Sequence, residues 1–186
     1  LNIKTKEIAY LLGFLWADGT VHKGSILTEI LKSDFDSIKS LFSKTGQWAI
    51  KERTRKNSPN KPLTTVSTHN HEISDFLRDN HYDKKRYYSA NDILSKIPSN
   101  LQYLFFRGWI DGDGTIDISL EKKRYRVYIW GSIEQNWDVF NNLLNKLEIK
   151  FSIKTKIKPT GSYSFICISN KAGIKKICDF IYQNFN

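Results

Sequence analysis

The chain has 186 residues, of which 40% are apolar and 26% are charged, so it can form one globular domain or two small fused halves. Its apolar runs are far shorter than the roughly 20 residues that a membrane span needs, which argues against a membrane protein. We expect an intracellular protein, in a compartment that the sequence does not indicate. The 29 lysines and arginines against 19 acidic residues give a net charge of +10, which indicates a polyanionic partner, with nucleic acid ahead of a membrane surface.

The first distinctive segment is residues 10–19, an apolar run that ends in Ala17-Asp18-Gly19. Gly13 and Ala17 are four residues apart, so on a helix both would lie on one face, where another backbone can approach closely. Glycine inside a helix costs about 0.5 to 1 kcal/mol relative to alanine, which calls for such a packing reason. Gly19 suits the left-handed conformation that often closes a helix. We therefore predict a packed helix that ends at Asp18.

The rest of the first half alternates helix and strand patterns. We predict a helix over residues 34–41, and a β-branched run at residues 63–68 that leads into Asn70, a good helix N-cap. Between them, basic residues alternate with other residues, as on one face of a strand. The basic residues of this half that we expect on a nucleic-acid surface are Lys51, Arg53, Arg55 and Lys61.

A polar and charged stretch separates the two halves. It covers residues 79–98 and includes Lys84-Lys85-Arg86, and we assign it as a linker between a first repeat, residues 1–78, and a second repeat, residues 99–186. Ser99 and Gln102 form a capping-box pattern that should start the next helix.

The second half repeats the pattern of the first. Residues 105–114 again run from apolar residues into Asp-Gly, with Gly108 and Gly112 four residues apart and Asp113 located 95 positions after Asp18. A helix is predicted over residues 133–147, with Ser132 and Gln135 as its capping box. Each half therefore reads helix, strand, strand, helix, strand, strand, helix. The matching basic strand residues are Lys154, Lys156 and Lys158, and Asn170 is the matching N-cap.

Asp18 and Asp113 pose an electrostatic problem if the two helices pack together. The C-terminus of a helix carries partial negative charge, and the two carboxylates would also repel each other. A hard divalent cation would relieve both, because it takes carboxylate oxygens and the free carbonyls of a helix end. The pair therefore predicts a metal centre.

Residues 11–19 and 106–114 resemble the two copies of the nine-residue motif of the LAGLIDADG homing endonucleases, of the single-chain, two-motif type. The resemblance implies an α+β fold of two pseudo-symmetric αββαββα repeats, with saddle-shaped antiparallel sheets over the DNA and the motif helices at the central interface. It implies that Asp18 and Asp113 are catalytic metal ligands, and we expect carbonyls near Ala17 and Gly112 to assist them. The earlier acidic position of the motif is Trp16 in the first copy and Asp111 in the second.

Members of this family also carry a basic residue near the end of the second strand of each half. Lys32 matches that position and is our third catalytic candidate, whereas Gly131 stands in the second half. Nearby basic residues could substitute for the missing one, and two of them complete the expected DNA-binding set. These candidates are Lys122, Lys123, Arg124 and Arg126, of which Arg124 and Arg126 belong to that set.

The resemblance implies a site-specific double-strand DNA endonuclease that is encoded in an intron or intein and acts as a monomer. Mg²⁺ is the expected cofactor, with Mn²⁺ as a substitute and Ca²⁺ as an ion that binds without supporting cleavage. The alternative is a non-cleaving protein on the same scaffold, either an RNA-splicing maturase with intron RNA as its partner or a DNA-binding protein.

Two other signals have simpler structural interpretations. The sequence His69-Asn70-His71 falls where a strand turns into a helix, and we expect it to serve capping and surface roles. The tryptophans in apolar runs are expected in the core rather than as base-stacking platforms. These are Trp16, Trp109, Trp130 and Trp137.

Overall fold

The computed structural model describes the chain except for residues 23, 56–57, 122–123, 160 and 184–186, and except for the side chains of residues 55 and 58–60. The first half contains α1 (Lys6–Asp18), β1 (Thr20–His22), β2 (Ser25–Leu31), α2 (Lys32–Thr45), β3 (Ala49–Arg55), β4 (Ser58–Thr68) and α3 (His71–Asp79). The second half contains α5 (Gln102–Asp113), β5 (Gly114–Ser119), β6 (Arg124–Ser132), α6 (Asp138–Lys146), β7 (Ser152–Lys156), β8 (Tyr163–Ile168) and α7 (Lys171–Ile181).

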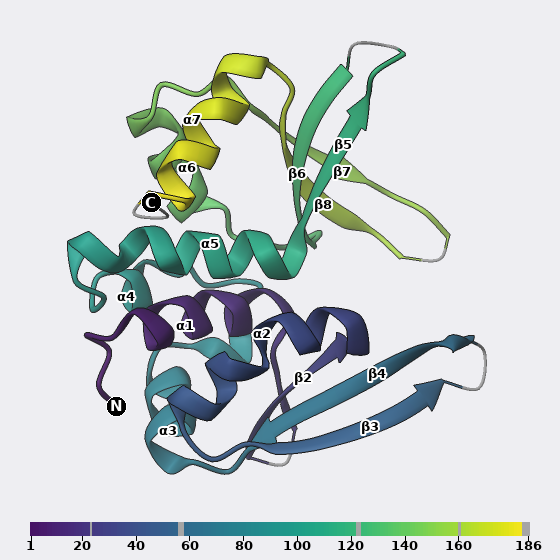
Figure 1. The fold of residues 1–186 in the computed structure, drawn as a ribbon. Helices are drawn as coiled ribbons and strands as arrows, with labels where there is room; N and C mark the ends of the chain where they lie inside the picture. The colour runs from purple at the N-terminus through teal and green to yellow at the C-terminus, as the bar shows by residue number, and fades with distance from the viewer. Residues whose placement is uncertain (23, 56–57, 122–123, 160, 184–186) are drawn as a thin grey trace.

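Each half forms one antiparallel sheet of four strands. The strand order is β1-β2-β4-β3 in the first sheet and β5-β6-β8-β7 in the second, so the two halves share one topology. The helices α1 and α5 lie side by side at the centre, and the two sheets spread apart on one side of them (Figure 1). The expected α+β fold of two αββαββα units is confirmed.

The central helices approach closely because glycine stands at their crossing points. A β-carbon added at Gly13 would collide with the backbone of Phe105, and one added at Gly108 would collide with the backbone of Tyr10. Further along, a β-carbon at Gly112 would lie 2.7 Å from Cβ of Ala17. The small residues therefore serve the close approach that their spacing predicts.

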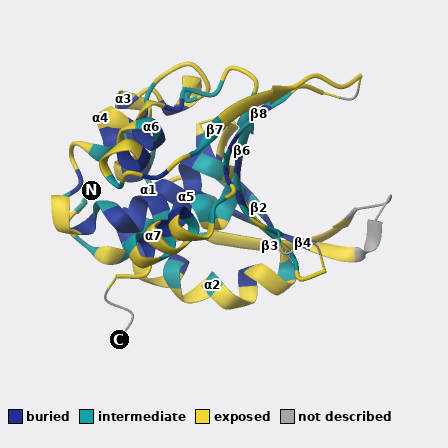
Figure 2. Cartoon of the chain, turned by 90° about the horizontal axis from the view of Figure 1, so that it is seen from above, coloured by how far each residue is buried: buried dark blue, intermediate teal, exposed yellow. Residues whose placement is uncertain are grey.

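The core runs from this helix pair into the helix-facing side of each sheet, as the dark-blue segments of Figure 2 show. Trp16, Trp109 and Trp137 are buried, as expected. Trp130 is not in the core: it is half-buried, and its strand neighbours Val127 and Ile129 point the other way, into the core. The expectation for Trp130 is wrong because a strand alternates its side chains between faces.

The predicted helix caps form where the side chain bonds a backbone group two or three residues away. Asn70 accepts a hydrogen bond from the backbone N–H of Glu72, and Asn170 from that of Gly173, so both N-caps are confirmed. The side-chain amide of Gln102 instead donates to the carbonyls of Leu94 and Ile97, so it does not complete a capping box.

Two other expectations at helix ends are wrong. Helix α6 begins at Asp138 and not at residue 133, because β6 continues through Ser132. Gly19 and Gly114 are extended, with φ values of −78° and −87°, rather than left-handed. Strand β1 begins directly after Gly19 and β5 begins at Gly114 itself, so both glycines need extended backbone.

The connecting segment, between α3 and α5, packs against the rest of the chain. It contains the 3-10 helices η1 (Tyr82–Lys84) and η2 (Ser99–Leu101) and the short helix α4 (Asn91–Leu94). The side chains of Tyr82, Ile93 and Ile97 from this segment are buried. Within the described part of the chain, none of the helices has the length and apolar character that crossing a membrane requires.

We expect Gly13→Ala to destabilise the fold, because the added methyl group meets backbone atoms of Phe105 that cannot move without separating the helices. The free energy of unfolding should fall by about 2 kcal/mol or more in urea denaturation. Ser37→Ala, on the exposed face of α2, is the control and should change it by less than about 0.5 kcal/mol. Equal stability of the two variants would contradict the close approach.

Candidate functional site

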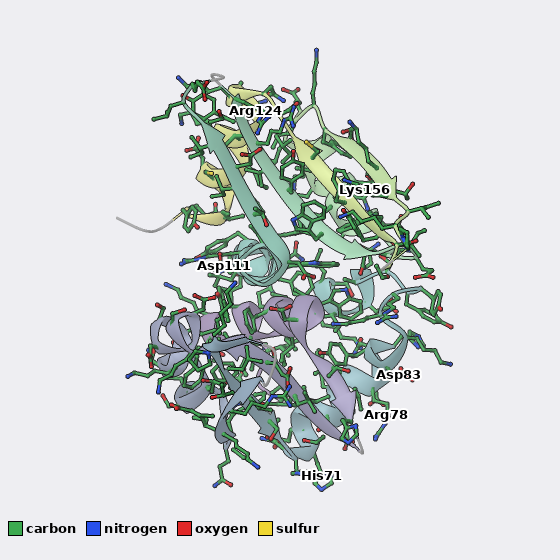
Figure 3. All side chains as sticks on the ribbon, turned by 90° about the vertical axis from the view of Figure 1, so that its right-hand side faces the viewer. His71, Arg78, Asp83, Asp111, Arg124 and Lys156 are labelled. Atoms are coloured by element: carbon green, nitrogen blue, oxygen red, sulfur yellow. The ribbon has the colours of Figure 1, made fainter. Side chains whose placement is uncertain are left out.

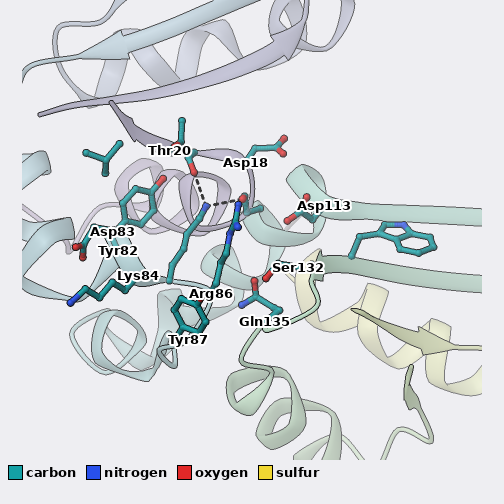
Figure 4. A pocket seen from close by; sticks show the side chains of 16 residues that line it. Asp18, Thr20, Tyr82, Asp83, Lys84, Arg86, Tyr87, Asp113, Ser132 and Gln135 are labelled. Carbon is teal, nitrogen blue, oxygen red and sulfur yellow. Dashed lines mark hydrogen bonds between the residues drawn. The ribbon is translucent and has the colours of Figure 1, made fainter. Parts of the chain in front are cut away.

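The C-terminal ends of α1 and α5 bring the two motif aspartates to one place. Asp18 and Asp113 both line a cavity of about 890 Å³ together with Ala17 and residues of the connecting segment. Figure 4 shows the two aspartates at the neighbouring helix ends, with the side chain of Arg86 reaching towards them. The sequence-predicted pair is therefore assembled in the structure, by the same glycine-mediated packing that joins the helices.

The environment resists ionisation of both carboxylates. Burial raises the pKa of Asp18 above its ordinary value, against the opposing effect of Lys85. Burial and the nearby negative charge of Asp18 raise the pKa of Asp113 to about 7, again against Lys85. Two acids at negative helix ends therefore create a demand for positive charge, as their positions in the sequence predict.

Lys85 of the connecting segment meets part of that demand. Its ammonium Nζ donates to the carbonyl oxygens of Trp16 at 2.6 Å, Gly19 at 2.7 Å, Ala17 at 2.8 Å and Leu15 at 3.1 Å. Burial lowers the pKa of Lys85 to about 8, although Asp113 and Asp18 both favour its charged form. The lysine thus caps the C-terminus of α1 beside the two carboxylates.

A second cavity, of about 560 Å³, also reaches Asp18. Gly112 lines this cavity, whereas Asp113 and Ala17 line the first one. Its acidic lining residues are Asp18, Glu29, Asp34 and Asp111. Two of these carboxylates already have partners. Glu29 forms an ion pair with Arg53. Asp111 accepts a hydrogen bond from the Tyr10 hydroxyl at 2.8 Å and lies 3.6 Å from Arg107 Nε.

The residues at the helix ends fit a hard divalent cation. The available ligand atoms are carboxylate and backbone carbonyl oxygens, which such an ion prefers. Burial raises the pKa of both carboxyl groups, so a nearby cation would stabilise their ionised forms. No group of three or more histidine, cysteine, aspartate or glutamate side chains in the described part of the chain could hold a metal by itself. An ion at this place would therefore complete its coordination with backbone oxygens, water or a bound phosphate.

Lys32, the third catalytic candidate, is not among the residues that line either cavity. It is the first residue of α2, and its ammonium lies 2.7 Å from a carboxylate oxygen of Glu52 on β3. Its catalytic role stays a prediction. In the second half, the matching Gly131 does line the first cavity.

The first sheet presents part of its expected basic surface. Lys51 and Arg53 are exposed, lie on one face of β3 and pair with Thr65 and Leu63 of β4, and Lys61 is also exposed. Arg55 is in β3, but its side chain lies outside the described residues, as do Lys122 and Lys123 entirely.

The second sheet combines basic and aromatic side chains on the face away from its helices. Arg124 and Arg126 share that face with Lys154 and Lys156, while Lys158 lies beyond the end of β7 and over the ring of Tyr163 (Figure 3 labels Arg124 and Lys156). Arg124 pairs with Asp117 at 3.1 Å, and Arg126 donates to the Tyr128 hydroxyl at 3.1 Å.

Four aromatic side chains form the centre of this face. The ring centroid of Trp130 lies 5.3 Å from that of Tyr128, 4.9 Å from Phe165 and 5.4 Å from Tyr163. Sequence reasoning missed this cluster, although the alternation of two aromatic residues in β6 and of two in β8 was a usable signal. It also missed Lys85, which nothing in the sequence distinguishes from the neighbouring Lys84.

Residues 100–182 match the sequence profile of the LAGLIDADG-like domain family. The second half of the chain is therefore similar to a LAGLIDADG-like domain. The repeated topology extends the LAGLIDADG fold over the first half as well, so the resemblance seen in the sequence is confirmed as a two-motif LAGLIDADG architecture.

Solved LAGLIDADG structures share this fold at low sequence identity. The N-terminal LAGLIDADG domain of DUF199/WhiA superposes with a TM-score of 0.66 at 15% identity, covering 100% of this chain and 86% of that one. A mesophilic variant of the homing endonuclease I-DmoI gives 0.61 at 14% identity, covering 100% and 94%. I-DmoI in complex with DNA and Mn gives 0.58 at 16% identity, covering 99% and 100%. No curated protein sequence matches the chain.

The raised pKa of Asp113 makes the stability of the metal-free chain depend on pH. Because its pKa is higher in the folded state than in the unfolded state, Asp113 contributes most to stability below pH 4, and this contribution is lost as the pH rises through about 7. The free energy of unfolding should therefore fall by about 2 kcal/mol between pH 5 and 7.5 relative to Asp113→Asn, as measured by urea denaturation with a chelator. Asp92→Asn, at an exposed site, should follow the original chain; a pH profile that Asp113→Asn leaves unchanged would contradict the assignment.

Proposed function

We propose that the chain is a site-specific double-strand DNA endonuclease that depends on a divalent metal, with Mg²⁺ as its natural ion. The observation that carries this proposal is the meeting of Asp18 and Asp113 at adjacent helix ends, in a cavity of a protein with a net charge of +10. Its fold is shared with the homing endonuclease I-DmoI, whose structure has been solved with DNA and Mn. We further propose that it is a monomer encoded in an intron or intein.

The chain's own residues have distinct tasks in this reaction. Asp18 and Asp113 would hold the metal, together with the carbonyl oxygens of Ala17 and Gly112. A divalent ion at this place supplies an activated water and relieves the negative charge of the phosphate. Lys84 and Arg86 line the same cavity and would attract a backbone phosphate towards the carboxylates.

Lys32 has a conditional task in this proposal. It would stabilise the negative charge that develops on the phosphate. To do so, its ammonium group must break the ion pair with Glu52 and contact the DNA instead. Two observations favour a second candidate, a DNA- or RNA-binding protein that does not cleave: this ion pair, and the capture of the Ala17 carbonyl by Lys85.

The two open sheets would supply the binding surface. Basic side chains on an exposed sheet face can contact phosphates, or base edges in the major groove. The proposed contacts are Lys51, Arg53, Arg55, Lys61, Arg124, Arg126, Lys154, Lys156 and Lys158. The aromatic cluster gives the second sheet an aromatic centre, whereas the strands of the first sheet contain no phenylalanine, tyrosine or tryptophan.

In vitro selection of cleaved molecules from a random DNA library with Mg²⁺ tests the function and supplies the target. On the selected DNA, Asp18→Asn and Asp113→Asn should each reduce the cleavage rate by about 100-fold or more, because each removes a charge that holds the metal. Asp92→Asn, on an exposed position of α4, should cleave normally. Full cleavage by either motif variant would overturn the assignment, and tight RNA binding without any cleavage would favour the second candidate.

Binding should also depend on salt through the second sheet. Each phosphate contact lowers log K by about 0.9 per log unit of salt, so the double variant Lys154→Ala/Lys156→Ala should reduce the slope by about 1.8 in fluorescence-anisotropy titrations. Lys171→Ala/Lys175→Ala removes the same charge from α7, on the helix side of this sheet, and should leave the slope nearly unchanged. Equal effects of the two double variants would show that only net charge matters.

A further inference from the structure

Lys85 has the contacts of a bound cation rather than those of a surface lysine. Its Nζ lies between 2.6 and 3.1 Å from four backbone carbonyl oxygens of the α1 terminus. An ammonium group has three hydrogens, so this carbonyl cage leaves it no hydrogen for another partner. The Tyr82 ring lies 5.0 Å from the same Nζ, and the Tyr82 hydroxyl donates to Leu15 at 2.6 Å, which fixes the segment that carries the lysine.

The position of Lys85 makes the two sides of the carboxylate pair unequal. On one side, the cavity that contains Asp113 and Ala17 also contains Lys84, Lys85 and Arg86. On the other side, the cavity that contains Asp18 and Gly112 has acidic lining residues and, among the residues that the structure describes, no basic ones. Asp18 reaches both cavities, whereas Asp113 reaches only the basic one.

These contacts have a direct consequence for metal binding. A divalent ion that used the Ala17 carbonyl would have to displace the Lys85 ammonium, which lies 2.8 Å from that oxygen, or remain beside its positive charge. On the Gly112 side, no basic side chain lines the cavity among the residues that the structure describes. A β-carbon built on Gly112 would be 3.7 Å from the carboxylate carbon of Asp18.

We propose that Lys85 is a built-in cation that replaces a metal ion on the Asp113 side, so that the chain holds one tightly bound divalent ion, through Asp18. The consequence for cleavage, which rests on the proposed endonuclease function, is that the two DNA strands are cut at unequal rates and a nicked intermediate accumulates.

Metal binding by the chain alone tests this inference without any DNA. In titrations with Mn²⁺ followed by electron paramagnetic resonance, the unaltered chain should bind one ion tightly. Lys85→Met should bind a second ion, whereas Lys84→Met, which removes a neighbouring charge from the same cavity, should still bind one. Binding of two equivalent ions by the unaltered chain, or of none, would overturn the proposal.

A second comparison keeps the test decisive if Lys85→Met does not fold. In the chain without DNA, Asp18→Asn should weaken the tight Mn²⁺ site by about tenfold or more. Asp113→Asn should weaken that site by less than about threefold, because the ion that Asp113 would hold during cleavage binds only weakly while the Lys85 ammonium occupies its place. Equal losses in these two variants would overturn the proposal. One tight ion with no DNA cleavage would leave this inference standing and remove the proposed function, so the two failures are distinguishable.

Discussion

The backbone contact between α1 and α5 is the constraint on which the rest of the molecule depends. Gly13 and Gly108 allow each helix to touch the main chain of the other, so the two helix axes come closer than side chains would permit. That contact fuses the two sheets into one body and fixes the distance between them. It also forces two negative helix ends, each with a carboxylate, into one small volume.

The electrostatic cost of this arrangement explains the chemistry around it. Burial and mutual repulsion hold the carboxylate pKa values high, and positive charge has to come from elsewhere. Lys85 supplies one such charge from inside the chain, and a metal ion or arriving cations would supply the rest. The pair of acids is therefore more useful for binding a cation than for holding the fold together, because its own contribution to stability is unfavourable when both are ionised.

Features fixed by short-range sequence patterns could be predicted, and features that depend on the path of the chain could not. The small residues spaced by four, the duplicated Asp-Gly endings and the Asn70 and Asn170 caps can each be recognised within one or two turns of helix. Gln102 has the spacing of a capping box but finds carbonyls of the connecting segment instead. Trp130 looked like a core residue because its neighbours are apolar, yet one step along a strand reverses the face. Lys85 and Lys84 are adjacent lysines, and only the fold distinguishes the buried ammonium from the exposed one.

The origin of Lys85 in the connecting segment limits how symmetric this molecule can be. A two-fold arrangement offers two equivalent positions for every feature, but a single chain has only one connection between its halves. Any residue carried by that connection can serve one position and never its mate. The repeat gives the two halves matching helices, sheets and acids, and the segment that joins them adds a part without a counterpart. A chain built this way can assign different tasks to its two halves without changing either repeated motif.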